Sequence, residues 1–155
     1  MRGKAQSKRK INPDPKFNSL VIGKFINYIM RMGKKSVAQS IVYKSLDIIS
    51  EKTKQDGLSV FNLAIKNVAP SLEVKGRRIG GANYQVPIVV SNERKQVLAF
   101  RWIIDSARAR KGRAMAEKLA DEIISASNNE GEAMKKKINV HKMAESNRAF
   151  AHFAR

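Results

Sequence analysis

The chain has 155 residues and carries 31 Lys and Arg against 13 Asp and Glu, which gives a net charge of +18. This length suggests one domain with a substantial core, and the absence of cysteine excludes disulfides and thiolate metal sites. No apolar run approaches the ~18 residues that a membrane-spanning helix needs. So large a positive excess indicates an anionic partner, nucleic acid first and an acidic membrane surface second.

Positive charge is concentrated at the start of the chain, where residues 1–35 hold ten cations and one acid. The first ten residues contain almost nothing apolar and cannot bury enough surface to fold alone. We interpret them as an arm that becomes ordered along phosphates, the alternative being a solvated tail. The charged start lacks a following apolar stretch and does not fit a secretory signal. We expect a basic extension over 1–17 and a single domain over 18–155.

Helical periodicity dominates the first half of the chain. The first helix would bury Phe25 and Met32 on one face and stop at Gly33. Ser36 would cap the second helix, and the third would turn Leu63 inward. Residues 36–69, which contain the second and third helices, carry almost no net charge, and we interpret this stretch as scaffold. The predicted bounds of these three helices are about 18–32, 36–53 and 59–68.

The pattern changes to a period of two after Pro70. Apolar residues alternate from Tyr84 to Val90, as in a strand with one buried face, and a first strand is predicted over 72–79. Gly80 and Gly81 suit a tight hairpin turn because both turn residues can require a positive φ. A two-stranded ribbon is marginally stable by itself, so we expect its base to pack on the helices and its tip to project.

Three further helices are predicted, over about 92–108, 114–127 and 132–150. Asn128 to Gly131 would separate the last two. No internal repeat is present. The fold class we expect is mainly α: a bundle of about six helices with one protruding two-stranded β-hairpin, about 72–90, and a basic N-terminal extension.

Chemical motifs are scarce. His141 and His152 make a poor metal site without cysteine, and surface or capping roles are the simpler interpretation. The run RMGKKS lacks the glycine spacing and hydroxyl of a phosphate loop. Glu117, Asp121 and Glu122 read as a solvated helix face. We therefore expect no catalytic residue, no metal and no cofactor.

The hairpin is the strongest candidate for a binding element. Lys75, Arg77 and Arg78 crowd one strand, and the turn glycines allow close approach of another backbone. Tyr84 and Gln85 add a ring and an amide that can stack on and hydrogen-bond to bases. The cations could instead be edge charges that prevent aggregation. Composition leaves DNA and RNA open, since a basic ribbon can also bend DNA through the minor groove.

Several segments resemble one known family in the same order along the chain. The stretch RRIGGANYQVP resembles the hairpin signature of the small-subunit ribosomal protein seven family, bacterial type. The FIN..M..GKK run at 25–35, EKT at 51–53, RW at 101–102, KLA at 118–120 and KMAESNRAFAHF at 142–153 are also similar. The resemblance covers nearly the whole chain.

This resemblance implies a helical domain with a protruding hairpin and a primary binder of small-subunit ribosomal RNA. The protein would seat on the 3′ major domain and start assembly of the subunit head. The hairpin and last helix would approach messenger RNA and exit-site transfer RNA. Small-subunit proteins nine and eleven would be neighbours, with no membrane partner. The expected location is the small ribosomal subunit in the cytoplasm, or in an organellar matrix or stroma.

The chain departs from the family pattern at three places: Gly76 stands where Ser is expected, Met32 stands where Asp is common, and the end AHFAR lacks the expected aromatic terminus.

Carried onto this chain, the resemblance implies two groups of nucleic-acid contacts. The implied ribosomal RNA contacts are Arg2, Lys4, Lys8, Arg9, Lys10, Lys34, Lys35, Lys75, Arg77, Arg78, Gly80, Gly81, Tyr84, Gln85, Arg94, Lys95, Arg101, Arg108, Arg110, Lys111 and Arg113. The residues implied to lie toward transfer RNA are Lys136, Lys142 and Arg148.

Overall fold

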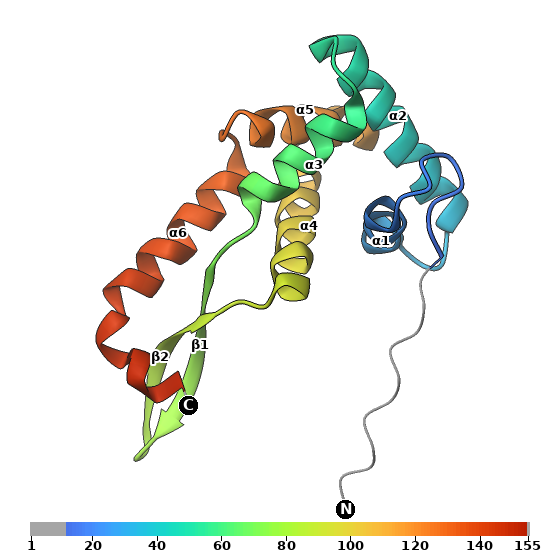
Figure 1. Ribbon diagram of the computed structural model, residues 1–155. Helices are drawn as coiled ribbons and strands as arrows, with labels where there is room; N and C mark the ends of the chain where they lie inside the picture. Colours follow the sequence, from blue (N-terminus) through green and yellow to red (C-terminus); the bar gives the residue numbers. More distant parts are fainter. Residues whose placement is uncertain (1–11, 155) are drawn as a thin grey trace, which may run out of the picture. The chain divides into compact units, whose positions relative to one another are not determined.

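The computed structural model describes residues 12–154 (Figure 1). The chain forms two compact units, Met1–Ser40 and Ile41–Arg155, and helix α2, Lys35–Thr53, contains the boundary between them. Within residues 12–154 the elements are helical apart from one two-stranded antiparallel sheet, so the predicted mainly α fold with a β-hairpin is confirmed. The division into 1–17 and 18–155 stays a prediction.

The first unit is built around α1, Leu20–Ile29. Ser19 caps this helix, and its Oγ accepts a hydrogen bond from the Ile22 amide at 3.5 Å. The helix is shorter than predicted because Met30 is already extended (φ −54°, ψ 135°). Phe25 is buried as expected, but Met32 is 94% exposed at a φ of 51°, so its predicted core position is wrong.

The start of α2 also differs from the prediction. The helix begins at Lys35, so Ser36 lies inside its first turn and does not cap it. Gly33 has a φ of 71° and belongs to the turn between the helices, not to the end of α1. The turn therefore combines two residues in the left-handed region, Met32 and Gly33, after the helix has already ended at Ile29.

The second unit packs its helices around large apolar side chains. Beyond α2 it contains α3 (Gly57–Val68), α4 (Asn92–Ala109), α5 (Met115–Ser127) and α6 (Glu132–Ser146). Phe61, Phe100, Ile103 and Leu119 are each no more than 1% exposed. Burying a side chain of this size contributes about 1.5–3 kcal/mol. Leu63 is 48% exposed, so its predicted inward position is wrong and Phe61 fills the core instead.

The hairpin of the second unit consists of β1, Leu72–Ile79, and β2, Ala82–Val89. The two strands pair in a regular antiparallel register from Leu72 opposite Val89 to Ile79 opposite Ala82. Val86, midway along β2, is fully buried, and Figure 1 shows the tip of the hairpin extending away from α3 and α4. The predicted first strand and the position of the turn are therefore confirmed.

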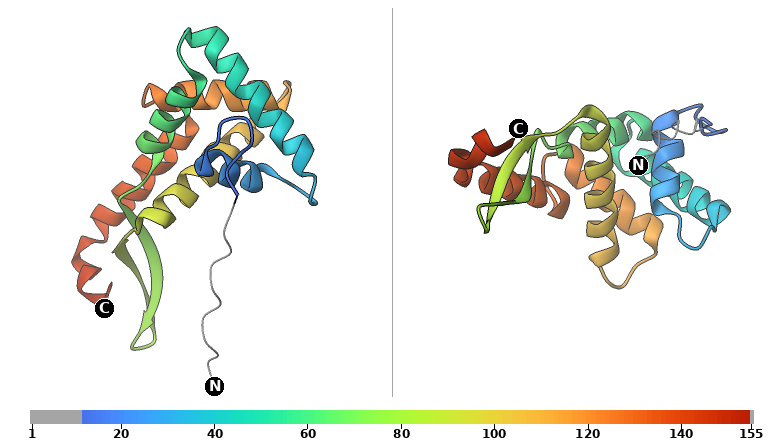
Figure 2. Two further views of the ribbon diagram at one scale, coloured as in Figure 1. Left: turned by 45° about the vertical axis from the view of Figure 1, so that its right-hand side comes forward. Right: turned by 90° about the horizontal axis from the view of Figure 1, so that it is seen from below.

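The C-terminal helix does not continue to residue 150 as predicted. It ends at Ser146, and a 3-10 helix, η1 (Arg148–Ala154), follows. The Asn147 side chain donates to the Met143 carbonyl at 2.7 Å and closes the end of α6. In both views of Figure 2, η1 lies beside the hairpin, with which it makes tertiary contacts. Those contacts hold the chain in a course that a longer α-helix would not follow.

Within 12–154, no helix combines the length and the hydropathy needed to cross a membrane. The same residues contain no group of three or more His, Cys, Asp or Glu placed to hold a metal ion.

Candidate nucleic-acid interface

Adjacent arginines of β1 have different environments. Successive strand residues point to opposite faces of a sheet, so Arg77 and Arg78 point apart. The Arg77 guanidinium is half-buried and donates to the carbonyl oxygens of Phe153 at 2.8 Å and Ala154 at 3.3 Å. Arg78 is exposed opposite Asn83. Of the two predicted RNA contacts, Arg78 is available to a ligand, whereas Arg77 secures the C-terminal segment.

The hairpin turn is open to the approach of another chain. Gly80 and Gly81 have φ values of 58° and 90°, the left-handed conformation that a tight two-residue turn requires. A Cβ atom added at either glycine would meet nothing within 4 Å. The same is true at Gly76, which faces Gln85 across the ribbon. The turn therefore exposes backbone that side chains do not cover, and Gln85, which pairs with Gly76 further along the ribbon, is also exposed.

Tyr84 belongs to an aromatic cluster. Its ring centroid lies 5.2 Å from that of Phe150 and 5.5 Å from that of Phe153. These spacings are typical of attractive aromatic pairs. The ring predicted to stack on bases thus already packs against η1.

Cations at the base of the hairpin surround one carboxylate. Glu73 pairs with Lys75 at 3.1 Å and with Arg94 of α4 at 3.2 Å. Burial alone would raise the pKa of Glu73, but the hydrogen bonds from these two cations outweigh it and hold that pKa below 4.5. Lys95, the next residue of α4, is half-buried. The structure thus brings Lys75 and Arg94 together and partly neutralises both.

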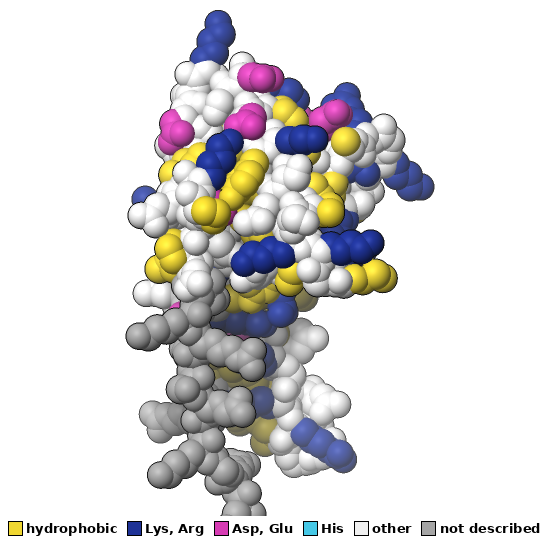
Figure 3. All heavy atoms as spheres, turned by 90° about the vertical axis from the view of Figure 1, so that its right-hand side faces the viewer, with side chains coloured by type: hydrophobic (Ala, Val, Ile, Leu, Met, Phe, Trp, Pro, Cys, Tyr) yellow, Lys and Arg dark blue, Asp and Glu magenta, His cyan; other side chains and the backbone are white. Residues whose placement is uncertain are grey.

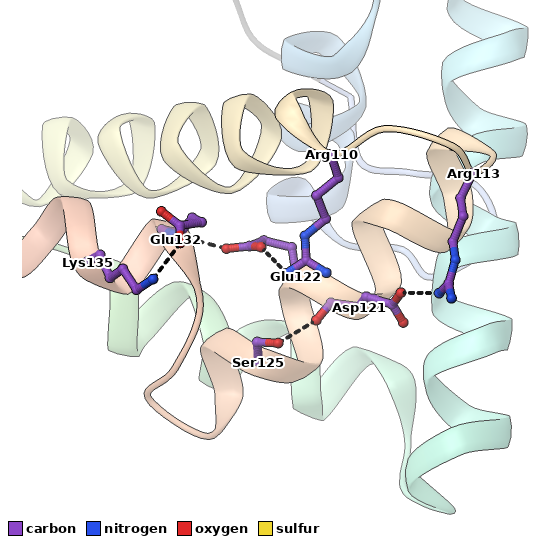
Figure 4. A network of polar contacts seen from close by, with 8 residues as sticks. Arg110, Arg113, Asp121, Glu122, Ser125, Glu132 and Lys135 are labelled. Atoms are coloured by element: carbon purple, nitrogen blue, oxygen red, sulfur yellow. Dashed lines mark hydrogen bonds and ion pairs between the residues drawn. The ribbon is translucent and has the colours of Figure 1, made fainter.

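A second group of predicted contacts lies in the loop between α4 and α5 (Figure 4). Arg110 Nη2 donates to Glu122 Oε2 at 2.6 Å, and Arg113 Nη1 donates to Asp121 Oδ2 at 3.1 Å. Lys111 is exposed between the two arginines. Both arginines are therefore attached to consecutive carboxylates of α5.

Glu122 is buried where the sequence predicted an exposed position. It was expected on a solvated face, but its side chain is fully buried. Besides Arg110, it accepts a hydrogen bond from the Ala133 amide at 2.9 Å. One signal could have revealed this position: Glu122 follows Met115 by seven residues and Leu119 by three, which places it on the apolar face of α5.

The other predicted contacts belong to α2, to α4 and to the N-terminal tail. Lys34 and Lys35 are exposed at the start of α2, in the first unit and at its boundary helix. Arg101 is exposed and Arg108 half-buried on α4, and both already have partners within the protein. The tail residues Arg2, Lys4, Lys8, Arg9 and Lys10 lie outside the described residues.

The predicted transfer-RNA side of the molecule is carried by α6 and η1. Lys142 and Arg148 are exposed and Lys136 is half-buried. The neighbouring Lys137 donates to the Asn67 carbonyl, and burial lowers its pKa. His141 accepts from the Ser71 amide at 3.2 Å, which ties α6 to the start of the hairpin.

Lys and Arg side chains on one face of the molecule can be followed in Figure 3. On that face they lie at several separate places, among uncharged and acidic side chains, and do not form one block. This distribution suits contacts with a folded polyanion at several separate points.

Comparison with known proteins identifies relatives over nearly the full length. Residues 1–148 match the family model described as Ribosomal protein S7p/S5e. The small ribosomal subunit protein uS7 of Thermotoga maritima is 58% identical over 153 residues, 99% of each chain. The uS7 proteins of Afipia carboxidovorans (58% over 146 residues, 94% of each chain) and Thermosipho africanus (56% over 153 residues, 99% of each chain) are similarly close.

Proposed function

The chain belongs to the ribosomal protein S7p/S5e family, and we propose that it is a primary binder of small-subunit ribosomal RNA that seats on the 3′ major domain and starts assembly of the subunit head. Membership of the family makes the chain a structural component of the small ribosomal subunit and not an enzyme. The same membership weighs against a DNA-bending architectural protein, the alternative that composition left open.

The observation that carries the RNA-binding proposal is the exposed hairpin tip on a chain of charge +18. Lys and Arg replace condensed counterions along phosphates, which provides affinity without sequence reading. The major groove of A-form RNA is too deep and narrow to read, so shape and 2′-hydroxyl contacts would set specificity. A narrow ribbon with open backbone at its turn can enter a helix junction that the helical body cannot.

The predicted contacts differ in how directly they can act. Arg78, Gln85 and the turn backbone would form the tip contact, with Lys111 contributing from the loop. Lys34 and Lys35 would add phosphate contacts from the first unit, and the tail cations would extend along the RNA. Cations already held by carboxylates would contribute mainly through long-range attraction.

We further propose that α6 and η1 approach messenger RNA and exit-site transfer RNA. Lys142 of α6 and Arg148 of η1 are exposed, and both elements contact the hairpin, which supports this proposal. Small-subunit proteins nine and eleven would be neighbours in the assembled subunit. Photo-crosslinkers at these two residues, placed in reconstituted subunits, should label transfer RNA bound at the exit site. Absence of labelling there, with labelling from the hairpin tip on ribosomal RNA, would refute the transfer-RNA part.

Filter binding tests the central proposal. The purified chain should retain a transcript of the 3′ major domain far better than a 5′-domain transcript or random duplex DNA at the same salt. The logarithm of affinity should fall with the logarithm of salt by about 0.9 per duplex phosphate neutralised, or about 0.7 on single strands. Equal affinity for random DNA, or retention that ignores molar salt, would refute it. Deletion of residues 1–10 should reduce both affinity and slope.

A further inference from the structure

The loop 110–113 is attached at both ends to one helix. Arg110 and Arg113 reach consecutive residues of α5, Glu122 at 2.6 Å and Asp121 at 3.1 Å (Figure 4). Between them Gly112 has a φ of 84°, a conformation that favours glycine. The loop is therefore held in a defined course with its middle exposed.

The Glu122 carboxylate occupies an unusual position for a charged group. It has no exposed surface and lies on the apolar face of α5 beside Leu119 and Ile123, which are also fully buried. A buried charge is tolerated only where partners satisfy it, and an apolar residue at such a position is often no less stable. Core stability therefore does not explain this carboxylate.

Its second oxygen shows what else the carboxylate organises. Glu122 Oε1 accepts from the Ala133 amide in the first turn of α6 at 2.9 Å, a helix start with no capping side chain of its own. A Cβ atom added at Gly131 would lie 3.0 Å from that same oxygen. The carboxylate is thus fixed against the start of α6, and Arg110 is fixed against the carboxylate.

Asp121, like Glu122, joins an arginine of the loop to a group on another helix. Lys52 of α2 donates to its Oδ1 at 2.6 Å, while Arg113 binds Oδ2. The Lys52 hydrogen bond, acting against burial and together with the charges of Arg113 and Arg110, holds the pKa of Asp121 below 3.8. Asp121 is therefore ionised at neutral pH and keeps Arg113 in place.

We propose that Glu122 and Asp121 are positioning residues for RNA recognition: they turn Arg110 and Arg113 into anchors, so that Lys111 and the backbone of Gly112 are presented to a phosphate in one fixed geometry. The inference rests on the proposed binding of small-subunit ribosomal RNA. A loop that is already ordered loses less freedom on binding, so its contact contributes more affinity. Lys111 is the residue that touches RNA, and the acids act through it.

Replacing Asp121 or Glu122 should change RNA affinity in the direction opposite to the one that a simple loss of negative charge would give. Removing a negative charge from an RNA-binding protein should strengthen binding and steepen its salt dependence. Loss of positioning should instead weaken binding and make the salt dependence shallower, because one phosphate contact is lost. Glu117, an exposed acid on the same helix, provides the matched control for the charge effect.

The test uses the full chain and a transcript of the 3′ major domain. Asp121→Asn and Glu122→Gln should each weaken binding about three- to tenfold, with a salt slope shallower by about one phosphate. Glu117→Gln should bind as tightly as the wild type or more tightly. Combined with Lys111→Ala, Asp121→Asn should cost less than about twofold.

The outcomes are distinguishable. If circular dichroism shows that Glu122→Gln does not fold, Asp121→Asn decides alone, because the Asp121 side chain is 21% exposed and tolerates the exchange. If the wild type binds the transcript and Asp121→Asn binds it equally tightly or more tightly, the inference is overturned. The proposed function would still stand in that case. An equally large loss in the Lys111→Ala background also overturns it, since the acid would then act elsewhere. Failure of the wild type to bind would remove the proposed function and the inference together.

Discussion

Arg77→Ala should release the C-terminal segment from the hairpin. Its guanidinium donates to the carbonyl oxygens of Phe153 at 2.8 Å and Ala154 at 3.3 Å. A charged donor contributes about 1.5–3 kcal/mol where the bond is buried. The residue is half-buried and the second bond is long, so about 2 kcal/mol is expected for both together. That free energy corresponds to an opening equilibrium about 30-fold more favourable in the variant.

Hydrogen exchange measures that opening directly. Amides of residues 148–154, such as the Phe150 amide that donates to the Asn147 carbonyl at 3.0 Å, should exchange about 30-fold faster in Arg77→Ala. Amides of α5 should exchange at the wild-type rate, because Arg77 has no part in that core. The Tyr84 ring contacts with Phe150 and Phe153 would remain, so the segment should loosen without unfolding the hairpin.

Arg78→Ala is the matched control for this experiment. It removes an equal charge from the next residue of the same strand, on the opposite face and without a partner among the described residues. Exchange in 148–154 should stay at the wild-type rate. Exchange in Arg77→Ala within twofold of the wild type, or equal acceleration in both variants, would refute the assignment of Arg77 to the C-terminal segment.

Three further predictions concern stability and are measured by urea unfolding. Gly57→Ala would place a methyl group 2.6 Å from a backbone oxygen of α2 and should lower the free energy of unfolding by about 1–3 kcal/mol. In Gly76→Ala the methyl group enters open space, so this control should be neutral or stabilising. Equal effects of the two substitutions would contradict this reasoning. Arg110→Ala leaves the Glu122 carboxylate buried without its cation and should cost about 3 kcal/mol; a loss below about 1 kcal/mol would show that the pair is not structural. Glu73→Gln should destabilise the protein by a fraction of a kcal/mol at pH 7. Because the pKa of Glu73 is lowered in the folded protein, its contribution to stability is complete above pH 4.5 and is lost as the pH falls through the folded-state pKa. The difference in unfolding free energy between the wild type and Glu73→Gln should therefore vanish at low pH. A difference that persists there would contradict the assignment.

Local patterns predicted the hairpin well. A period of two, a pair of glycines and the preceding Pro70 were sufficient to place β1 at Leu72–Ile79 and the turn at Gly80 and Gly81. The helices α4 and α5 also lie within a residue or two of their predicted bounds, because each has a continuous apolar face. These features depend on residues close in the sequence, so one sequence carries enough information to find them.

Long-range contacts explain two of the misses, and residue type explains a third. The end of α6 at Ser146 depends on η1 packing against Tyr84, a residue more than sixty positions earlier, which periodicity cannot register. Leu63 and Phe61 both fit a helical core pattern, and only the surrounding helices decide that Phe61 is buried. Glu122 was read by residue type, although its position on the apolar face of α5 pointed inward.

The candidate interface shows the same division between charge and contact. Net charge can be counted from the sequence, and it sets the long-range attraction to a polyanion. Which cations remain available depends on acids brought close by folding, as Glu73 is to Arg94 and Glu122 is to Arg110. Each such pair leaves the net charge unchanged but removes a cation from direct phosphate contact. The measured salt slope should therefore report fewer phosphates than the number of implied cationic contacts. Single substitutions should matter most at exposed cations such as Arg78, which has no partner within residues 12–154.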